Sequence, residues 1–308
     1  MILFHGIPGR LGNQIFNLAA LDTLCGPRRF GILLGGPLLV GSFRWNRRRV
    51  LISRKRFTPV FRILRKMADH GIATVRIEHQ KETGFGLVDC GELKTIRDSR
   101  LPLTLVECSH LQAEHWVRPD FHDKLRFLPG TLADVERFRV ENEIDWASSI
   151  FVHVRRGDYV DLNVLHAGPP TPPPGYFVRG VERLHGRMRI SKTIFVSDDP
   201  GYVRETFGAR PDQIIVSRSP VFDLCVMSRC ASGVLSPSSY SWWGWMLGPK
   251  RIPPVAPRYW LGWKRAIALP GGIVSQQFDL LDLDTAGTAP LAQNGSTPAA
   301  VVDDARSQ

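Results

Sequence analysis

The chain has 308 residues, of which 43% are hydrophobic and 22% charged, as is usual for a folded soluble protein of about two domains. These values exclude a disordered or collagen-like chain, and no apolar run reaches the roughly 18 residues that span a bilayer. The formal net charge is +11, which suits binding to nucleic acid, an anionic membrane or an acidic small substrate without choosing among them.

The first 145 residues predict an α/β domain. Residues 1–7 suit a strand and residues 8–12 a loop, and Asn13 is expected to cap a helix over residues 14–25. Weaker patterns predict further strands at residues 30–34, 73–77 and 103–106 and helices at residues 60–67 and 131–142.

From Arg44 to Lys66 the sequence holds ten Lys or Arg residues and no Asp or Glu, nearly all of the excess charge. One interpretation is a solvated basic face. The functional alternative is attachment to an anionic bilayer, with Trp45, Phe57 and Phe61 as interfacial anchors. A nucleic-acid interface is disfavoured, because the chain has no helix-turn-helix, RNP or zinc pattern and the segment has few aromatic residues for base stacking.

A regular alternation begins after Asp145. Strands at residues 149–154, 193–197, 213–216 and 233–235 are separated by helical stretches of about ten residues, which predicts βα units on a parallel sheet. We therefore expect a domain boundary near residue 145, a second α/β domain at residues 146–284, and a disordered tail at residues 285–308, which are poor in large apolar side chains.

The most specific local signal is the segment Phe151-Val-His-Val-Arg-Arg-Gly-Asp-Tyr159. Arg155 and Arg156 follow a buried strand, and ligands of parallel sheets bind at the carboxyl ends of strands. Two guanidinium groups there can hold a pyrophosphate, and Gly157 lets the backbone turn. The alternative is that both arginines only pair with Asp158 and nearby carboxylates.

Two further clusters follow predicted strands. Ser236-Pro-Ser-Ser239 precedes a helix, so hydroxyl groups, backbone N–H groups and a helix dipole meet there as in a phosphate site, although such serines also serve only as caps. Ser197-Asp-Asp-Pro200 places Asp199 at an N-cap and leaves Asp198 without a structural role. Its carboxylate can then accept hydrogen bonds from a ribose or a guanine.

Other patterns are weaker. Gly9-Arg-Leu-Gly-Asn13 lacks the spacing of a phosphate-binding glycine loop. Asp282 and Asp284 have the D-x-D spacing of metal-dependent sugar transferases but border the expected disordered tail, and the nine histidines show no ligand spacing, so no metal is expected. Three tryptophans at positions 242, 243 and 245 are interpreted as helix packing.

Four segments taken together resemble the α-1,2-fucosyltransferases of glycosyltransferase family 11. They are Gly9-Arg-Leu-Gly-Asn-Gln-Ile-Phe16, His153-Val-Arg-Arg-Gly-Asp-Tyr-Val160, Ser197-Asp-Asp199, and the run from Asp223 to Cys230 with Ser238-Ser-Tyr-Ser-Trp-Trp243. The resemblance extends to about residue 265. The chain departs from it at Asn17-Leu18, where Gln-Tyr is usual, and at Pro237, where a polar residue is frequent.

The resemblance implies a GT-B-like architecture, in which two Rossmann-like α/β domains face a cleft. GDP-fucose would lie on the C-terminal domain and a glycan acceptor on the N-terminal domain, with no metal or cofactor. Arg155 and Asp158 are the expected catalytic residues, and Arg155 would hold the β-phosphate of GDP. Together with the strand-end argument, the expected substrate-binding residues are Gly12, Asn13, His153, Arg156, Asp198, Ser238 and Ser239.

The expected reaction transfers L-fucose from GDP-β-L-fucose to the 2-hydroxyl of a galactoside, with inversion in one in-line displacement. Arg155 and the helix-end donors would stabilise the charge that develops on the leaving GDP. The alternative is another nucleotide-sugar transferase on the same scaffold with a different sugar or linkage, since it would share every donor motif.

Five cysteines without a C-x-x-C pair indicate neither a disulfide framework nor a zinc site. We interpret them as mostly buried thiols in a reducing compartment. The start of the chain has no basic leader and no A-x-A cleavage site, so a secretory signal is not expected. The expected location is the cytoplasm, with peripheral attachment to the inner face of the membrane if the basic segment binds lipid.

Overall fold

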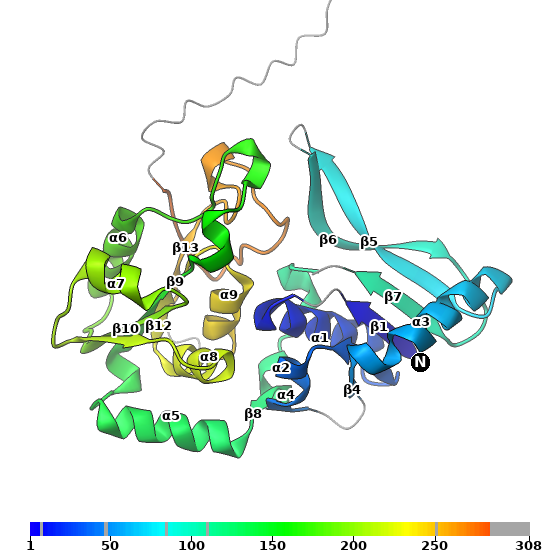
Figure 1. The fold of residues 1–308 in the computed structure, drawn as a ribbon, viewed down its shortest axis with the longest axis horizontal. Coiled ribbons are helices and arrows are strands. Elements are labelled where there is room, and N and C mark those ends of the chain that lie inside the picture. The colour runs from blue at the N-terminus through cyan, green and yellow to red at the C-terminus, as the bar shows by residue number, and fades with distance from the viewer. Residues whose placement is uncertain (7–8, 46–48, 84–85, 109–110, 250–251, 284–308) are drawn as a thin grey trace, which may run out of the picture.

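The computed structural model describes residues 1–283 except 7–8, 46–48, 84–85, 109–110 and 250–251. Two six-stranded sheets, one in each half of the chain, form the framework, and helices cover them (Figure 1). The prediction of a disordered tail at residues 285–308 falls outside the described residues.

The N-terminal sheet has the strand order β4-β2-β1-β7-β5-β6, in which only β6 is antiparallel to its neighbour. Its strands are β1 (Ile2–Gly6), β2 (Gly31–Gly35), β4 (Arg49–Ser53), β5 (Thr74–Thr83), β6 (Gly86–Arg97) and β7 (Thr104–Cys108). The helices beside it are α1 (Leu11–Cys25), α2 (Pro37–Val40) and α3 (Arg54–Met67).

The two faces of this sheet are covered by different helices, because successive side chains of a strand point to opposite faces. Ile2 and Phe4 of β1 pack in the core that contains α1. Leu3 packs with Leu34 and with Phe61 of α3 in a separate core. Helices α1 and α3 therefore lie on opposite faces of the sheet.

The C-terminal sheet is parallel throughout, with the order β11-β10-β9-β12-β13-β14. Its strands are β9 (Ser149–Val154), β10 (Lys192–Ser197), β11 (Gln213–Val216), β12 (Ser232–Val234), β13 (Val255–Pro257) and β14 (Asp279–Leu281). Its helices are α6 (Pro174–His185), α7 (Pro200–Phe207), α8 (Pro220–Arg229) and α9 (Ser239–Met246). The chain leaves β9 first toward β10 and later toward β12, and this reversal opens a crevice at the carboxyl ends of those strands.

Helices α1, α8 and α9 are buried almost all round, because their apolar residues are not confined to one stripe. Phe16 of α1 contacts the rings of Trp242 and Trp243 of α9, with centroids 4.7 and 5.0 Å apart. The interpretation of the three α9 tryptophans as packing residues is confirmed, since all three are buried.

Three elements connect the halves in the described part of the chain: α4 (Phe121–Lys124), β8 (Arg126–Phe127) and α5 (Pro129–Glu141). Strand β8 pairs with the short strand β3 (Phe43–Arg44) of the N-terminal half. Although α5 precedes residue 145, it packs against α8 of the C-terminal half, where the ring of Phe138 meets that of Phe222. The chain thus reaches the C-terminal half before α5 begins.

Several local predictions are wrong. Helix α1 begins at Leu11 with Arg10 at its N-cap, so Asn13 does not cap it. Helix α3 begins at Arg54, earlier than residue 60, because its polar first turn shows no apolar spacing. Two expected membrane anchors pack against the core: Phe61 is buried, and Trp45 is partly buried and packs on Phe121.

Two observations concern the chain as a whole. No helix in the described part of the chain is long and apolar enough to cross a bilayer. The four cysteines whose side chains the structure describes are buried, and none of them forms a disulfide: Cys25, Cys108, Cys225 and Cys230.

Candidate active site

A cavity of about 580 Å³ lies where the carboxyl ends of β9 and β10 and the N-terminal ends of α1 and α9 meet. Its walls come from both halves of the chain. The N-terminal half contributes Arg10, Leu11, Asn13, Leu38 and Gln112. The C-terminal half contributes His153, Arg155, Asp158, Tyr159, Val196, Ser197, Asp198, Ser217, Arg218, Pro220, Asp223, Ser238, Ser239, Tyr240 and Leu261. Seven of the nine residues predicted from the sequence are among them.

Arg155 is the first residue after β9, and its side chain is only 10% exposed. Its guanidinium pairs with Asp158 and, at 2.5 Å, with Asp198, and it lies 5.1 Å from the ring centroid of Tyr159. The expected pairing with neighbouring carboxylates is confirmed, while the role as a phosphate ligand stays a prediction. The carboxylates hold the guanidinium in a fixed position in the wall of the cavity.

Asp198 connects the loops that follow β9 and β10. Its Oδ2 pairs with Arg155, and its Oδ1 accepts the backbone N–H of Arg156 at 2.9 Å. The expectation that Asp198 has no structural role is therefore wrong. Gly157 is required for this approach, because a Cβ at that position would overlap the carboxylate and the backbone φ is +26°.

Arg156 does not line the cavity. Its guanidinium stacks 3.7 Å from the ring centroid of Tyr202 and pairs at 3.2 Å with Asp199, which caps α7 through the N–H of Tyr202. Alternation along β9 sends neighbouring side chains to opposite faces, so only one of two consecutive arginines can point into the crevice. The structure thus corrects the prediction that both arginines hold one pyrophosphate.

The N-terminal half contributes a cation to the cavity, Arg10, at the N-cap of α1. Its guanidinium lies 3.4 Å from Asp158 and 3.6 Å from Asp198, so it reaches the carboxylates of the other half. Sequence reasoning missed this residue. The available signal was its place inside Gly9-Arg-Leu-Gly-Asn13, a loop that resembles a phosphate loop without matching its spacing.

The N-terminal ends of α1 and α9 are in direct contact beside the two arginines. Ser239 donates to Oδ1 of Asn13 at 2.5 Å, and Gln112 donates to the same oxygen at 2.9 Å. A Cβ on Gly12 would lie 2.6 Å from the backbone nitrogen of Tyr240, so Gly12 acts as a spacer between the helices and does not line the cavity. Ser238 is the N-cap of α9. The first N–H groups of a helix lack partners within it and favour anions.

His153 is buried at the base of the cavity, and its Nδ1 lies 2.6 Å from Oγ of Ser236. Burial, together with the nearby Arg155 cation, lowers the pKa of His153 to about 3. The imidazole is therefore neutral at physiological pH. It contributes shape and hydrogen bonding to the site but no positive charge.

Asp223 was part of a motif but had no predicted role. Both of its carboxylate oxygens accept the backbone N–H of Arg218, at 3.1 and 3.2 Å, and burial raises its pKa to about 6. This carboxylate fixes the loop between β11 and α8 that forms one wall of the cavity.

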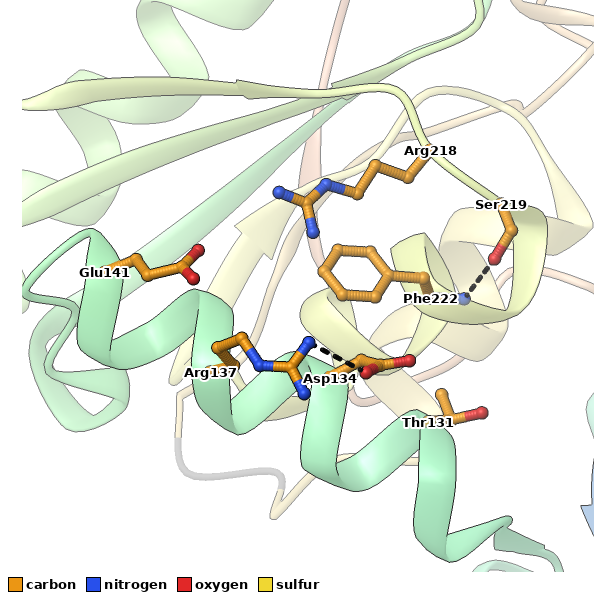
Figure 2. A pocket seen from close by; sticks show the side chains of 7 residues that line it. All are labelled: Thr131, Asp134, Arg137, Glu141, Arg218, Ser219 and Phe222. Carbon is orange, nitrogen blue, oxygen red and sulfur yellow. Dashed lines mark hydrogen bonds and ion pairs between the residues drawn. The ribbon is translucent and has the colours of Figure 1, made fainter.

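Arg218 separates this cavity from a second pocket between α5 and α8 (Figure 2). There its guanidinium lies 4.7 Å from the ring centroid of Phe222, while Arg137 pairs with Asp134 at 3.4 Å. Ser219 caps α8 through the N–H of Phe222, and no residue predicted for the site lies in this pocket. We therefore place the active site in the first cavity.

No three His, Cys, Asp or Glu residues gather as metal ligands in the part of the chain that the structure describes. In the D-x-D pair, Asp282 binds Arg258 at 2.6 Å, and Asp284 lies outside the described residues. The cavity instead combines the guanidinium groups of Arg10 and Arg155, two helix N-termini and several hydroxyl groups. This set of donors suits a ligand with a diphosphate.

Comparison with known proteins agrees with this geometry. The family model of glycosyl transferase family 11 matches residues 105–260, about half of the chain. The chain is 30% identical to the O-antigen biosynthesis glycosyltransferase WbnK of Escherichia coli over 122 residues. This aligned region covers 37% of this chain and 39% of that protein. It is 27% identical to an alpha-1,2-colitosyltransferase of Escherichia coli over 146 residues. This aligned region covers 45% of this chain and 50% of that protein. The matches thus span half or less of these relatives.

Solved structures resemble the fold. A crystal structure of NodZ alpha-1,6-fucosyltransferase co-crystallized with GDP matches with a TM-score of 0.50 and 14% identity, over 80% of this chain and 92% of that one. The fucosyltransferase NodZ from Bradyrhizobium matches with a TM-score of 0.50 and 13% identity, over 80% and 93%. The expected GT-B arrangement of two α/β halves is confirmed. Since the family model spans half of the chain and includes the loops that carry Arg155, Asp198 and Ser238, the chain belongs to glycosyl transferase family 11.

Proposed function

We propose that this glycosyltransferase moves L-fucose from GDP-β-L-fucose to the 2-hydroxyl of a galactoside in a glycan, with inversion. The observation that carries the proposal is the convergence of Arg155, Arg10 and the N-terminal ends of α1 and α9 on one cavity. A nucleoside diphosphate needs this combination of fixed cations and backbone donors. The co-crystallization of NodZ alpha-1,6-fucosyltransferase with GDP supports the same class of donor.

In this proposal the β-phosphate lies between Arg155 and the first turn of α9. Asp158 and Asp198 already hold the Arg155 guanidinium in place, so little reorganisation is needed when the ligand binds. Both oxygens of Asp198 already have protein partners, so its contact with the ribose or the guanine would share an oxygen with Arg155 or with the backbone of Arg156. Asn13, which Gln112 and Ser239 hold through its Oδ1, approaches the sugar from the N-terminal half.

The reaction is a single displacement at C1 of the fucose. The oxygen of the acceptor hydroxyl forms the new bond to C1, while the bond to the β-phosphate oxygen breaks and its electron pair leaves with GDP. The hydroxyl proton passes to the leaving phosphate or to water. Negative charge therefore grows on that phosphate oxygen in the transition state. Arg155 and the α9 N–H groups lie where this charge grows, and interactions that strengthen in the transition state raise the rate.

A second candidate is transfer of a different deoxy sugar through the same linkage. The observation in its favour is the relative that is named as an alpha-1,2-colitosyltransferase. Both candidates use the same phosphate site, so the difference lies in the contacts to the sugar ring.

The experiment is transfer by the purified protein to galactoside acceptors from GDP-fucose, GDP-colitose, GDP-mannose and UDP-galactose. We expect an α-1,2-linked fucoside by NMR, formed equally well with EDTA present, and loss of the product in Arg155→Ala. Arg156→Ala is the matched control, because the neighbouring arginine lies outside the cavity. Preference for GDP-colitose would favour the second candidate. A β-linked product, use of UDP-sugars only, or a requirement for Mn²⁺ would contradict the proposed reaction.

A further inference from the structure

Helix α3 exposes a stripe of large apolar side chains to solvent. Phe57, Val60, Ile63 and Met67 are 39%, 48%, 59% and 46% exposed. Their spacing of three or four residues places them along one side of the helix. The buried Phe61 points instead to the core beneath α3, so the stripe is not needed to hold the helix on its sheet.

Basic side chains flank this stripe. Lys55, Arg62 and Lys66 are exposed on the same helix, and the sequence from Arg44 to Lys66 contains no acidic residue. An apolar stripe with cations alongside is typical of a helix that lies in the interface of a membrane. A helix face that contacts only water has no need of such an apolar stripe, so the stripe argues against the interpretation as a solvated basic face.

The stripe also points away from the rest of the molecule. Helix α3 covers the face of the N-terminal sheet opposite to α1, and α1 is the helix that packs against α9 of the C-terminal half (Figure 1). A surface that binds α3 therefore leaves the contact between the halves untouched.

The start of α3 also lies at the same edge of the sheet as part of the cavity. The first turn of α3 follows β4, and Leu38 of the cavity follows the neighbouring parallel strand β2.

We propose that the exposed face of α3 binds the surface of an anionic lipid bilayer. Phe57, Val60, Ile63 and Met67 enter the boundary between headgroups and acyl chains, while Lys55, Arg62 and Lys66 contact lipid phosphates. The uniform positive charge selects this occupant over a second copy of the chain, whose α3 would carry the same charge and repel it. Phe61 takes no part, because it is buried, and Trp45 is partly buried against Phe121 and lies outside α3.

The test is co-sedimentation of the whole protein with vesicles of phosphatidylcholine that contain increasing phosphatidylglycerol, at low and at physiological salt. The charge variant is Arg62→Glu with Lys66→Glu. Its matched control is Arg189→Glu with Arg204→Glu, two exposed arginines of the C-terminal half with the same change in net charge. Losing two cations near an anionic surface weakens binding by about 30-fold, and the two added glutamates weaken it further.

A second pair of variants tests the apolar stripe. Val60→Ser with Ile63→Ser is compared with Val140→Ser with Val178→Ser, which are also exposed but lie on α5 and α6. We expect the α3 variants alone to lose vesicle binding, and all variants to keep wild-type circular dichroism and GDP affinity.

Several results would overturn the proposal. One is the absence of binding to anionic vesicles, and another is binding that does not depend on lipid charge. Equal loss in the α3 variants and their controls would show a general charge effect instead of a docking face. Self-association that the α3 variants abolish, without vesicle binding, would identify a second copy as the occupant.

Discussion

Replacing Gly12 by alanine should force apart the N-terminal ends of α1 and α9. The added Cβ would lie 2.6 Å from the backbone nitrogen of Tyr240 and 2.7 Å from the carbonyl carbon of Ser239, where ordinary contact begins at 3.4 Å. The helices must therefore separate by about 0.8 Å (3.4 minus 2.6), because backbone atoms cannot rotate away as a side chain would. Such overpacking costs about 1–3 kcal/mol of the free energy of unfolding.

The same displacement moves the first turn of α9 relative to Arg10. A shift of this size in a positioned group can lower kcat/KM by about 100-fold, so we expect weaker GDP binding together with slower transfer. Urea denaturation measures the loss of stability, and calorimetry with GDP measures the loss of nucleotide binding. Gly130→Ala is the control, because Gly130 lies in α5 with no atom within 4 Å of an added Cβ.

Gly130→Ala should be neutral or slightly stabilising, since alanine is the better helix former. If Gly12→Ala unfolded at the wild-type urea concentration and bound GDP with wild-type affinity, the close contact of the two helix ends would not exist in solution. The assignment of Gly12 as a spacer would then be wrong.

Three further predictions concern charged groups of the site. Arg155→Lys should lower kcat by a factor on the order of 10², because a point charge cannot replace the guanidinium fork. Arg156→Lys should leave turnover near wild type. Equal losses of kcat in the two variants in steady-state assays would contradict the assignment of Arg155 to the site. Arg10→Ala should weaken GDP binding about tenfold in calorimetry and GMP binding less, and an equal loss for both nucleotides would show that Arg10 does not contact the β-phosphate. Burial raises the pKa of Asp223 from 3.8 to about 6, so this group lowers stability as the pH rises between those values. Relative to wild type, Asp223→Asn should therefore gain about 2 kcal/mol between about pH 4 and pH 7 in urea denaturation, and a constant difference would refute the buried charge.

The C-terminal half was predictable because its signals are local. Strands β9 and β11 have the bounds expected from their apolar runs, and α7 begins at Pro200 behind the cap that Asp199 provides. In the N-terminal half, β4 was not predicted because basic residues dominate its neighbourhood. Strand β6 was not predicted because it depends on pairing with β5. Sequence periodicity carries no information about pairing partners.

The same distinction applies to the active site. Arg155, Asp198 and Ser239 were found because each follows a predicted strand, and parallel strands bring their carboxyl ends together. The spacer role of Gly12 and the contact of Gln112 with Asn13 depend on packing between residues far apart in the chain, which no local pattern encodes.

The ring contacts of Phe16 with Trp242 and Trp243 have a consequence for how substrates enter. Domains usually move relative to one another unless the interface between them is large and hydrophobic, and here one continuous apolar core contains α1 and α9. A hinge rotation that widened the crevice would bring these rings into water. The halves should therefore unfold in a single cooperative transition, and access to the cavity should depend on loop movements at its rim.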